Sequence, residues 1–392
     1  MDFLKKQTVF QLITVLCAFI LVFAAYSHIV GSGTIFKGSM EGSTIKAKVI
    51  RVTDVNRNNL TGDNEYVTVH FKALALNTEL RGKTLDVIQD IDKSYAFSPG
   101  EVEEGDRILI EAYTENNVTS YSFGDYVRIT TLVVLGLVFC ALVIIFSGIQ
   151  GVKTLVSLGL TCLSVFIVLI PAILNGLNIY FWAVLTCIFI TVVTLIVISG
   201  YNVKTFCACT GCMCGVVCAG LIAVLMDRFL NMTGLLEEES VYLVQLYPDN
   251  PINLKAIIFA MIIVGAVGAI MDVSMSVSSS LYELRSKSRN ISSSELIKSG
   301  FTIGRDMMGT MANTLVLAYI GSSLTCVLLM VSYNANLNQV INKEVIIEEI
   351  LQALAGSLGM LLTLPLTSVI CGVLYYRKVK PDASGKDEQS AQ

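Results

Sequence analysis

Histidine is nearly absent from the sequence. Only His28 and His70 occur among 392 residues, and both precede the main apolar part of the chain. A histidine proton relay or a histidine-ligated zinc site within that part is therefore excluded. Also missing are a nucleotide-binding loop, a G-x-S-x-G elbow and an H-E-x-x-H pair on any apolar segment. We therefore expect neither an ATP-driven pump nor an intramembrane metalloprotease. We also expect no enzymatic activity and no cofactor.

Charged side chains are scarce as well. They make up 15% of the residues, and hydrophobic residues make up 54%, whereas about a quarter of the residues are charged in soluble proteins. This composition indicates a membrane protein. Apolar runs of about 18 to 24 residues, each long enough to cross ~30 Å of hydrocarbon, lie near 8–26, 128–147, 153–174, 179–199, 204–226, 254–276, 310–333 and 350–375. The predicted fold is an all-α bundle of about eight transmembrane helices.

Cysteine is missing outside the apolar runs, which contain all eleven. A disulfide framework is therefore excluded in the polar segments. The fifth run concentrates five cysteines, four of them in a C-x-C-x-x-C-x-C pattern that resembles a thiolate metal loop, and Cys207, Cys214 and Cys218 share a helical face. A continuous helix sends Cys209 and Cys212 to another side, so we favour close packing beside glycines over a metal site.

Lysine and arginine accumulate in every second loop between the apolar runs, so they lie on one side of the membrane. This distribution predicts the orientation of the chain in the membrane. The basic residues of one side are Lys5, Lys6, Lys153, Lys204, Arg285, Lys287, Arg289, Lys298, Arg305, Arg377, Lys378, Lys380 and Lys386. Both termini are therefore predicted to be cytoplasmic. Residues 1–29 are predicted to form an uncleaved signal-anchor helix, because the apolar run is long and no small-x-small site follows it.

The domain organisation follows from these runs. Residues 30–127 show period-two alternation in short stretches bounded by turn residues, which predicts a small extracytoplasmic β-barrel or sandwich, with an oligonucleotide-binding-fold type as one option. Residues 128–376 are predicted to form a seven-helix transmembrane bundle, and residues 377–392 a disordered cytoplasmic tail. Within the bundle, Leu235–Leu246 either forms a short helix or belongs to a solvated acidic loop, which we favour.

Polar residues follow helical spacing in the sixth and seventh runs. Asp272, Ser276 and Ser279 recur four and three residues apart and lead toward the cytoplasm. In the seventh run Asp306, Thr310 and Asn313 share a face, with Arg305 beside it. Small residues, which allow a neighbouring helix to approach closely, accompany both stripes at Gly265, Gly268 and Gly309. A cytoplasmic loop joins the two helices, so we expect the stripes to face each other.

Three interpretations of these stripes stay open. Asp272 with Asp306 or Asn313 can form an oxygen-rich site for a cation or proton, as in secondary transporters. Either acid can instead pair with Arg305 in a salt bridge that fixes helix register. Asp306 can also simply cap the start of its helix.

Two motifs in this region resemble the YibE/F-like family of bacterial multi-pass membrane proteins. They are Gly-Ala-Val-Gly-Ala-Ile-Met-Asp-Val-Ser-Met-Ser at 265–276 and Gly-Arg-Asp-Met-Met-Gly-Thr-Met-Ala-Asn-Thr-Leu at 304–315. The resemblance covers nearly the whole chain and implies an N-terminal anchor, a small extracytoplasmic domain and a seven-helix bundle. It implies permease-like proteins in general terms and no particular substrate.

The leading hypothesis is a secondary-transporter or permease-like protein of the bacterial cytoplasmic membrane. Asp272, Asp306 and Asn313 would line a polar path, with Arg305 as their partner. The alternative is a non-enzymatic membrane scaffold or assembly partner that acts through its outer β domain. Besides the lipid bilayer, a small ion or solute, a second copy of the chain and another membrane protein stay open as partners, and no nucleic acid is expected.

Overall fold

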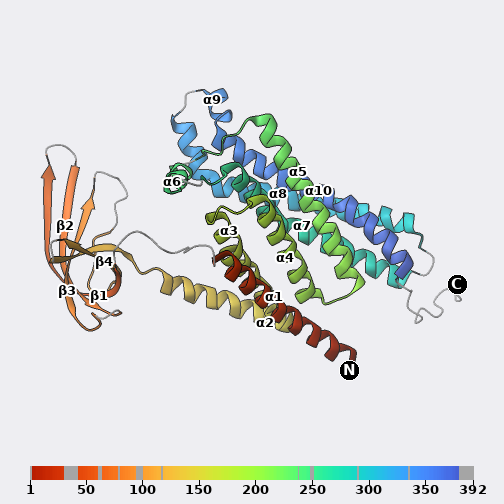
Figure 1. Cartoon of the computed structure of the whole chain (residues 1–392), viewed down its shortest axis with the longest axis horizontal. Coiled ribbons are helices and arrows are strands. Elements are labelled where there is room, and N and C mark those ends of the chain that lie inside the picture. Colours follow the sequence, from red (N-terminus) through yellow and green to blue (C-terminus); the bar gives the residue numbers. More distant parts are fainter. Residues whose placement is uncertain are drawn as a thin grey trace, which may run out of the picture. The chain divides into compact units, whose positions relative to one another are not determined.

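The computed structural model of the chain is mostly helical, with one small β domain (Figure 1). It describes residues 2–30, 43–60, 64–77, 80–93, 100–115, 118–236, 238–247, 251–288, 291–333 and 336–378. The chain divides into two compact units, Met1–Ile35 with Phe146–Gln392, and Phe36–Ile145. The predicted tail at 377–392 falls almost entirely outside the described residues.

The β domain is a closed five-stranded barrel. Its strands are β1 (Ser43–Leu60), β2 (Asn64–Ala75), β3 (Thr84–Asp92), β4 (Arg107–Glu115) and β5 (Val118–Tyr126), joined in the order β1-β2-β3-β5-β4. Neighbouring strands are antiparallel except β3 and β5. Alternate side chains, such as Val67, Val69 and Phe71 of β2, fill the interior. The predicted barrel is confirmed, and its five strands agree with an oligonucleotide-binding-fold type.

The first half of the helical part contains α1 (Asp2–Val30), α2 (Ile129–Leu163), the π-helical segment η1 (Ser164–Leu169), α3 (Ile170–Leu174), α4 (Ile179–Ser199) and α5 (Val203–Leu230). The runs predicted as separate helices at 128–147 and 153–174 are joined in one helical stretch, Ile129–Leu174. The described residues therefore contain seven long apolar helices, and not eight. Of the five residues that separate the runs, Gly148 interrupts the helix, with φ of 57° and ψ of −133°, and the other four are helical.

The second half contains α6 (Glu238–Leu246), α7 (Leu254–Lys287), α8 (Ser293–Tyr333), α9 (Leu337–Ile341) and α10 (Glu344–Lys378). Our preference for a solvated loop over a short helix at 235–246 was wrong, because α6 forms there. Both α7 and α8 extend beyond their apolar runs. The early start of α8 has a local cause, since Ser292 and Glu295 form a capping box in which each side chain accepts the other's backbone N–H.

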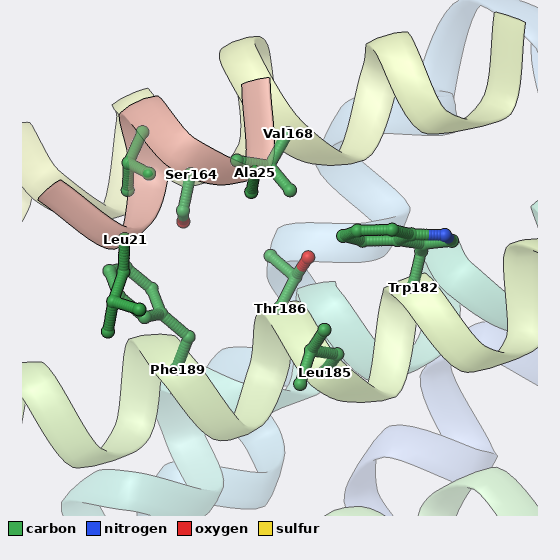
Figure 2. Close-up of a pocket in the computed structure, with 9 residues that line it drawn as sticks. Leu21, Ala25, Ser164, Val168, Trp182, Leu185, Thr186 and Phe189 are labelled. Carbon is green, nitrogen blue, oxygen red and sulfur yellow. The ribbon is translucent and has the colours of Figure 1, made fainter. Parts of the chain in front are cut away.

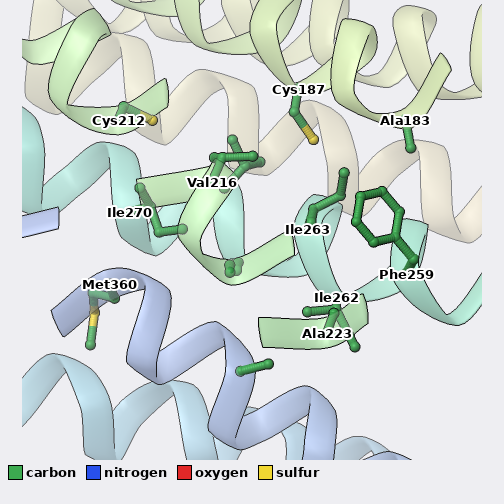
Figure 3. Close-up of a cluster of buried hydrophobic side chains, with 14 of the residues drawn as sticks. Ala183, Cys187, Cys212, Val216, Ala223, Phe259, Ile262, Ile263, Ile270 and Met360 are labelled. Atoms are coloured by element: carbon green, nitrogen blue, oxygen red, sulfur yellow. The ribbon is translucent and has the colours of Figure 1, made fainter. Parts of the chain in front are cut away.

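The main hydrophobic core lies where α5, α7 and α10 pack together, with α4 beside them (Figure 3). Cys212 and Val216 of α5 face Ile263 and Ile270 of α7, and Met360 of α10 belongs to the same cluster. Close approach depends on glycines: a Cβ at Gly211 would clash with Thr367 of α10, and one at Gly215 with Thr363. The same device brings α8 onto α10, where Gly300 meets Ser368 and Gly304 meets Leu364.

Candidate functional site

Helix α7 has two faces of different character. Its N-terminus is capped by Asn253, whose side chain accepts the backbone N–H of Ala256 at 3.2 Å. The face toward α5 and α10 is apolar and buried, and it includes Ile262, Ile263, Ala266, Ile270 and Val277. The opposite face exposes Met261, Gly265, Gly268 and Asp272, which recur at spacings of four, three and four. We call these four residues the α7 stripe.

The predicted polar residues lie on exposed or half-exposed positions. Asp272, Arg305, Asp306, Thr310 and Asn313 are exposed, and Ser276 and Ser279 are half-buried. Within the described part of the chain, no hydrogen bond or ion pair joins the polar residues of α7 to those of α8. The expected two-helix site is therefore not assembled by direct contacts.

The two structural interpretations of these residues fail. No ion pair among the described residues involves Asp272, Arg305 or Asp306, so the predicted salt bridge is absent from that part of the chain. Asp306 does not cap a helix start, because α8 begins at Ser293 and Asp306 lies well inside it.

The glycines predicted for close packing behave differently from one another. A Cβ at Gly265 would lie 2.6 Å from the Tyr319 hydroxyl of α8, so this glycine does allow a close approach. Gly268 and Gly309 do not, because a Cβ at either position would meet nothing within 4 Å. The prediction was wrong for these two, because both lie on exposed helix faces. The glycines that allow close packing against α10 lie instead on buried helix faces.

Two serines of α7 that were not among the predicted site residues bond to neighbouring helices. Ser274 donates to the carbonyl oxygen of Ala208 at 2.5 Å, and Ser278 donates to that of Lys204 at 2.8 Å. The Ser278 hydroxyl also lies 2.6 Å from the Tyr375 hydroxyl of α10. These buried bonds join α7 to α5 and α10. Their signal in the sequence was the position of both serines on the face of Ile270 and Val277.

The cysteines of α5 are divided between environments. Cys207, Cys209 and Cys212 are buried in the bundle, and Cys214 and Cys218 are half-buried. Cys212 contacts the Thr191 hydroxyl of α4 at 3.5 Å and lies among apolar side chains (Figure 3). Within the described ranges, no group of three or more histidine, cysteine or acidic side chains is arranged to hold a metal ion.

An acidic pocket of about 470 Å³ lies at the start of α7 and α10. Three carboxylates line it: Glu239 of α6, and Glu348 and Glu349 of α10. Glu348 is 3% exposed. The other lining residues are Gly234, Leu236, Ser240, Leu243, Leu254, Ile257, Ile258, Met261 and Val345. Glu349 is half-buried and Glu239 is exposed, and a cavity lined by three carboxylates suits a positively charged occupant better than an anion.

The wall of this acidic pocket is held by a fourth acid. Glu344, at the start of α10, accepts hydrogen bonds from the backbone N–H groups of Thr233 and Gly234 at 2.5 and 2.6 Å, and from the Thr233 hydroxyl at 2.9 Å. Gly234 has a φ of +85° and lies against Leu254, at the first turn of α7. The loop before α6 is thereby fixed to both α7 and α10.

Tyr319 lies against the α7 stripe at Gly265. Its hydroxyl is buried between Gly265 of α7 and Gly356 of α10, and it has no hydrogen-bond partner among the described residues. Met261, at the outer end of the stripe, lines the pocket itself. The stripe thus runs from the pocket to Asp272, about 16 Å along the helix axis.

The acidic residues of the pocket were not predicted from the sequence, and Asp272 stays a predicted site residue. The last apolar run was taken to start at residue 350, which left Glu344, Glu348 and Glu349 in a preceding loop. Their signal was present, because Glu344 and Glu348 are one helical turn apart and directly precede the apolar run.

Comparison with known proteins gives one match. A family model described as YibE/F-like protein matches residues 135–377, which is more than half of the chain and includes α7, α8 and every residue of the acidic pocket. The barrel lies outside the matched range. No curated protein and no solved structure matches the chain.

Proposed function

The chain belongs to the YibE/F-like family, and from this premise we propose that it is a membrane protein that passes a small cation across the bilayer in the manner of a secondary transporter. The family match and the seven long apolar helices support the membrane part of the proposal. In this proposal the cation enters at the acidic pocket and moves along the α7 stripe to Asp272. The chain carries out no chemical reaction.

One observation carries the proposal: a single face of α7 links the acidic pocket to Asp272. Met261 belongs to the pocket, and Gly265, Gly268 and Asp272 follow it at helical spacing. Gly268 leaves room beside the helix, and an acidic residue within an apolar helix is functional by default, because its charge must be compensated. Carboxylates at both ends, with the Tyr319 hydroxyl between them, supply oxygen atoms to a cation that loses its water.

The orientation is part of the same proposal. Both termini lie in the cytoplasm, as the distribution of lysine and arginine predicts. This requires the chain to reverse direction near Gly148, where the helical dihedral angles are interrupted. The acidic pocket then faces the outside, and Asp272 lies toward the cytoplasmic half of the bilayer.

Flux measurements in proteoliposomes test the cation path. The wild type and the variants Glu348→Gln, Glu349→Gln and Asp272→Asn are compared for sodium, potassium and proton flux under an imposed gradient. We expect each variant to lower the flux at least tenfold, because each removes a compensating charge. Glu104→Gln, at an exposed acid of the barrel, is the matched control and should leave the flux unchanged. Equal flux in the wild type and in Asp272→Asn would remove Asp272 from the path.

The alternative function is supported by the separateness of the barrel. Together with the first part of α2 it forms a compact unit separate from the other helices, and it lies outside the family match. In this function the barrel binds another envelope component. Deletion of residues 31–127 distinguishes the two proposals, because it should abolish partner binding and leave cation flux through the bundle intact. Absence of flux in every variant, with partner binding lost on deletion, would favour the scaffold.

A further inference from the structure

A second pocket lies between α1, η1 and α4, away from the acidic residues (Figure 2). Its volume is about 220 Å³, larger than the roughly 150 Å³ cavity that accommodates a benzene ring in a protein core. The lining residues are Leu21, Val22, Ala25, Ser164, Val168, Trp182, Leu185, Thr186 and Phe189. None of them is charged, so the pocket is built for an apolar molecule about the size of a substituted ring.

Thr186 supplies the pocket with one hydrogen-bond donor. The residue is 3% exposed, and its hydroxyl has no partner within the described residues. Threonines in helices usually donate to the carbonyl oxygen one turn earlier, as Thr210 does to Phe206. The Thr186 hydroxyl is instead turned toward the pocket (Figure 2). A buried hydroxyl without a partner destabilises the fold, and a ligand with an acceptor atom removes that cost.

Two aromatic rings flank this hydroxyl along α4. Trp182, Thr186 and Phe189 recur at spacings of four and three, so they share one helical face, and the rings lie on either side of Thr186 (Figure 2). Aromatic side chains pack favourably against another ring in stacked or edge-on arrangements. The pocket therefore offers a ring-sized space with a central donor.

The opposite wall comes from the π-helical segment η1. Ser164 and Val168 of η1 line the pocket, and the Ser164 hydroxyl already donates to the Thr161 carbonyl at 2.8 Å. Single π-helical turns are rare and occur frequently at functional sites. Leu21 and Leu185, at the rim, are 60% and 41% exposed. The pocket thus opens on the apolar exterior of the helices, where lipid would lie.

We propose that this pocket binds a lipid-soluble ring with a carbonyl acceptor, the chemistry of a prenylated quinone. The Thr186 hydroxyl donates to the ring carbonyl, Trp182 and Phe189 flank the ring, and the tail leaves between Leu21 and Leu185. A lipid acyl chain fits less well. Thr186 lies about 10 Å along α4 from its start, where an acyl chain has no acceptor for the hydroxyl. The inference rests on membrane insertion and not on cation transport.

Tryptophan fluorescence tests this binding, because Trp182 is the only tryptophan in the chain. The full chain in lipid nanodiscs is titrated with a decyl-substituted benzoquinone, which quenches a tryptophan it contacts. We expect saturable quenching, about fivefold weaker binding for Thr186→Val, the loss expected for one neutral hydrogen bond, and recovery for Thr186→Ser. Ala25→Phe, which fills the pocket, should abolish the saturable part.

Thr191→Val is the matched control, because Thr191 is buried on the same helix but lies outside the pocket. It should bind the quinone as the wild type does. Linear quenching that is equal in the wild type, Thr186→Val and Ala25→Phe would overturn the proposal. A phospholipid with a brominated acyl chain is the second probe. If its quenching depends on Thr186 and that of the quinone does not, the occupant is an acyl chain and the proposal is wrong. No cation gradient is needed, so this result is independent of the flux measurements.

Discussion

Two glycines on neighbouring helices differ in what a side chain at their position would meet. A Cβ at Gly215 of α5 would clash with Thr363 of α10, whereas one at Gly268 of α7 would meet nothing within 4 Å. We expect Gly215→Ala to lower the free energy of unfolding by about 1–3 kcal/mol through overpacking. Gly268→Ala should be neutral or stabilising by up to about 1 kcal/mol, since alanine favours a helix over glycine.

Thermal unfolding of the two variants in the same detergent measures this difference. The wild type is the reference, and both substitutions add the same methyl group to an apolar helix. A lower melting temperature for Gly268→Ala would mean that another part of the chain or a second copy covers the α7 stripe.

A second residue-scale prediction concerns the acid response of the barrel. The hydrogen bond from Lys93 and the charges of Arg57 and Lys93 hold the pKa of Glu101 below its ordinary value of 4.5. Glu101 therefore binds fewer protons in the folded barrel than in the unfolded chain. Its stabilising contribution is complete above the ordinary pKa and is lost as the pH falls through the lower, folded-state value. The pair is half-exposed, so the contribution is under about 1 kcal/mol.

This contribution is measured by unfolding the full chain in urea. Hydrogen exchange of the barrel peptides reports the urea concentration at which the barrel unfolds. At pH 7 we expect Glu101→Gln to unfold at a lower urea concentration than the wild type. The difference should narrow toward pH 3, because the Glu101 charge is lost as the pH falls through its lowered pKa. Glu104→Gln, next to no charged partner among the described residues, should match the wild type at both values. A constant difference from pH 7 to pH 3 would contradict the assignment.

At the scale of elements, α10 fixes the loop in front of α6 through one side chain. Glu344 accepts three hydrogen bonds from Thr233 and Gly234. We expect Glu344→Ala to increase hydrogen exchange at the amides of Thr233 and Gly234 at least tenfold, because charge-assisted bonds contribute about 1.5–3 kcal/mol. Lys343→Ala, at the preceding exposed position, is the control and should leave exchange there unchanged. Equal exchange in both variants would show that the loop is held by other contacts.

The helices were predictable because apolar run length is a strong signal, and their ends were not. The capping box at Ser292 and Glu295 starts α8 well before its apolar run, so a boundary drawn from hydropathy alone came too late. The chain around Gly148 posed the opposite difficulty. The short gap at 148–152 between two apolar runs predicts a loop. In the structure the chain is helical on both sides of Gly148, and only this glycine departs from helical dihedral angles.

The candidate site was predictable only in part. Helical spacing identified Asp272 and the face on which it lies. Spacing does not say which face of α7 is buried, because that depends on where Gly211 and Gly215 of α5 allow close packing. The acidic pocket joins residues more than a hundred positions apart, Glu239 and Glu348. No local pattern contains such a contact.

For the whole molecule, the proposed orientation makes a direct prediction. Alkaline phosphatase, which folds only outside the cytoplasm, should be active when fused after residue 236. It should be inactive when fused after residue 150, and a fluorescent protein at the C-terminus should fold in the cytoplasm. These results are expected because the basic residues cluster on one side of the helices. Phosphatase activity at residue 150 would show that the chain does not reverse near Gly148.

The break at Gly148 also bears on how the chain fits a bilayer. The helical stretch Ile129–Leu174 contains 46 residues, and an uninterrupted rod of that length would span roughly 69 Å, more than twice the hydrocarbon thickness. Such hydrophobic mismatch would force many of its apolar side chains into headgroups or water. The dihedral angles at Gly148 belong to a region that L side chains rarely adopt. One hydrogen atom in place of a side chain therefore divides this long stretch into two shorter helical segments.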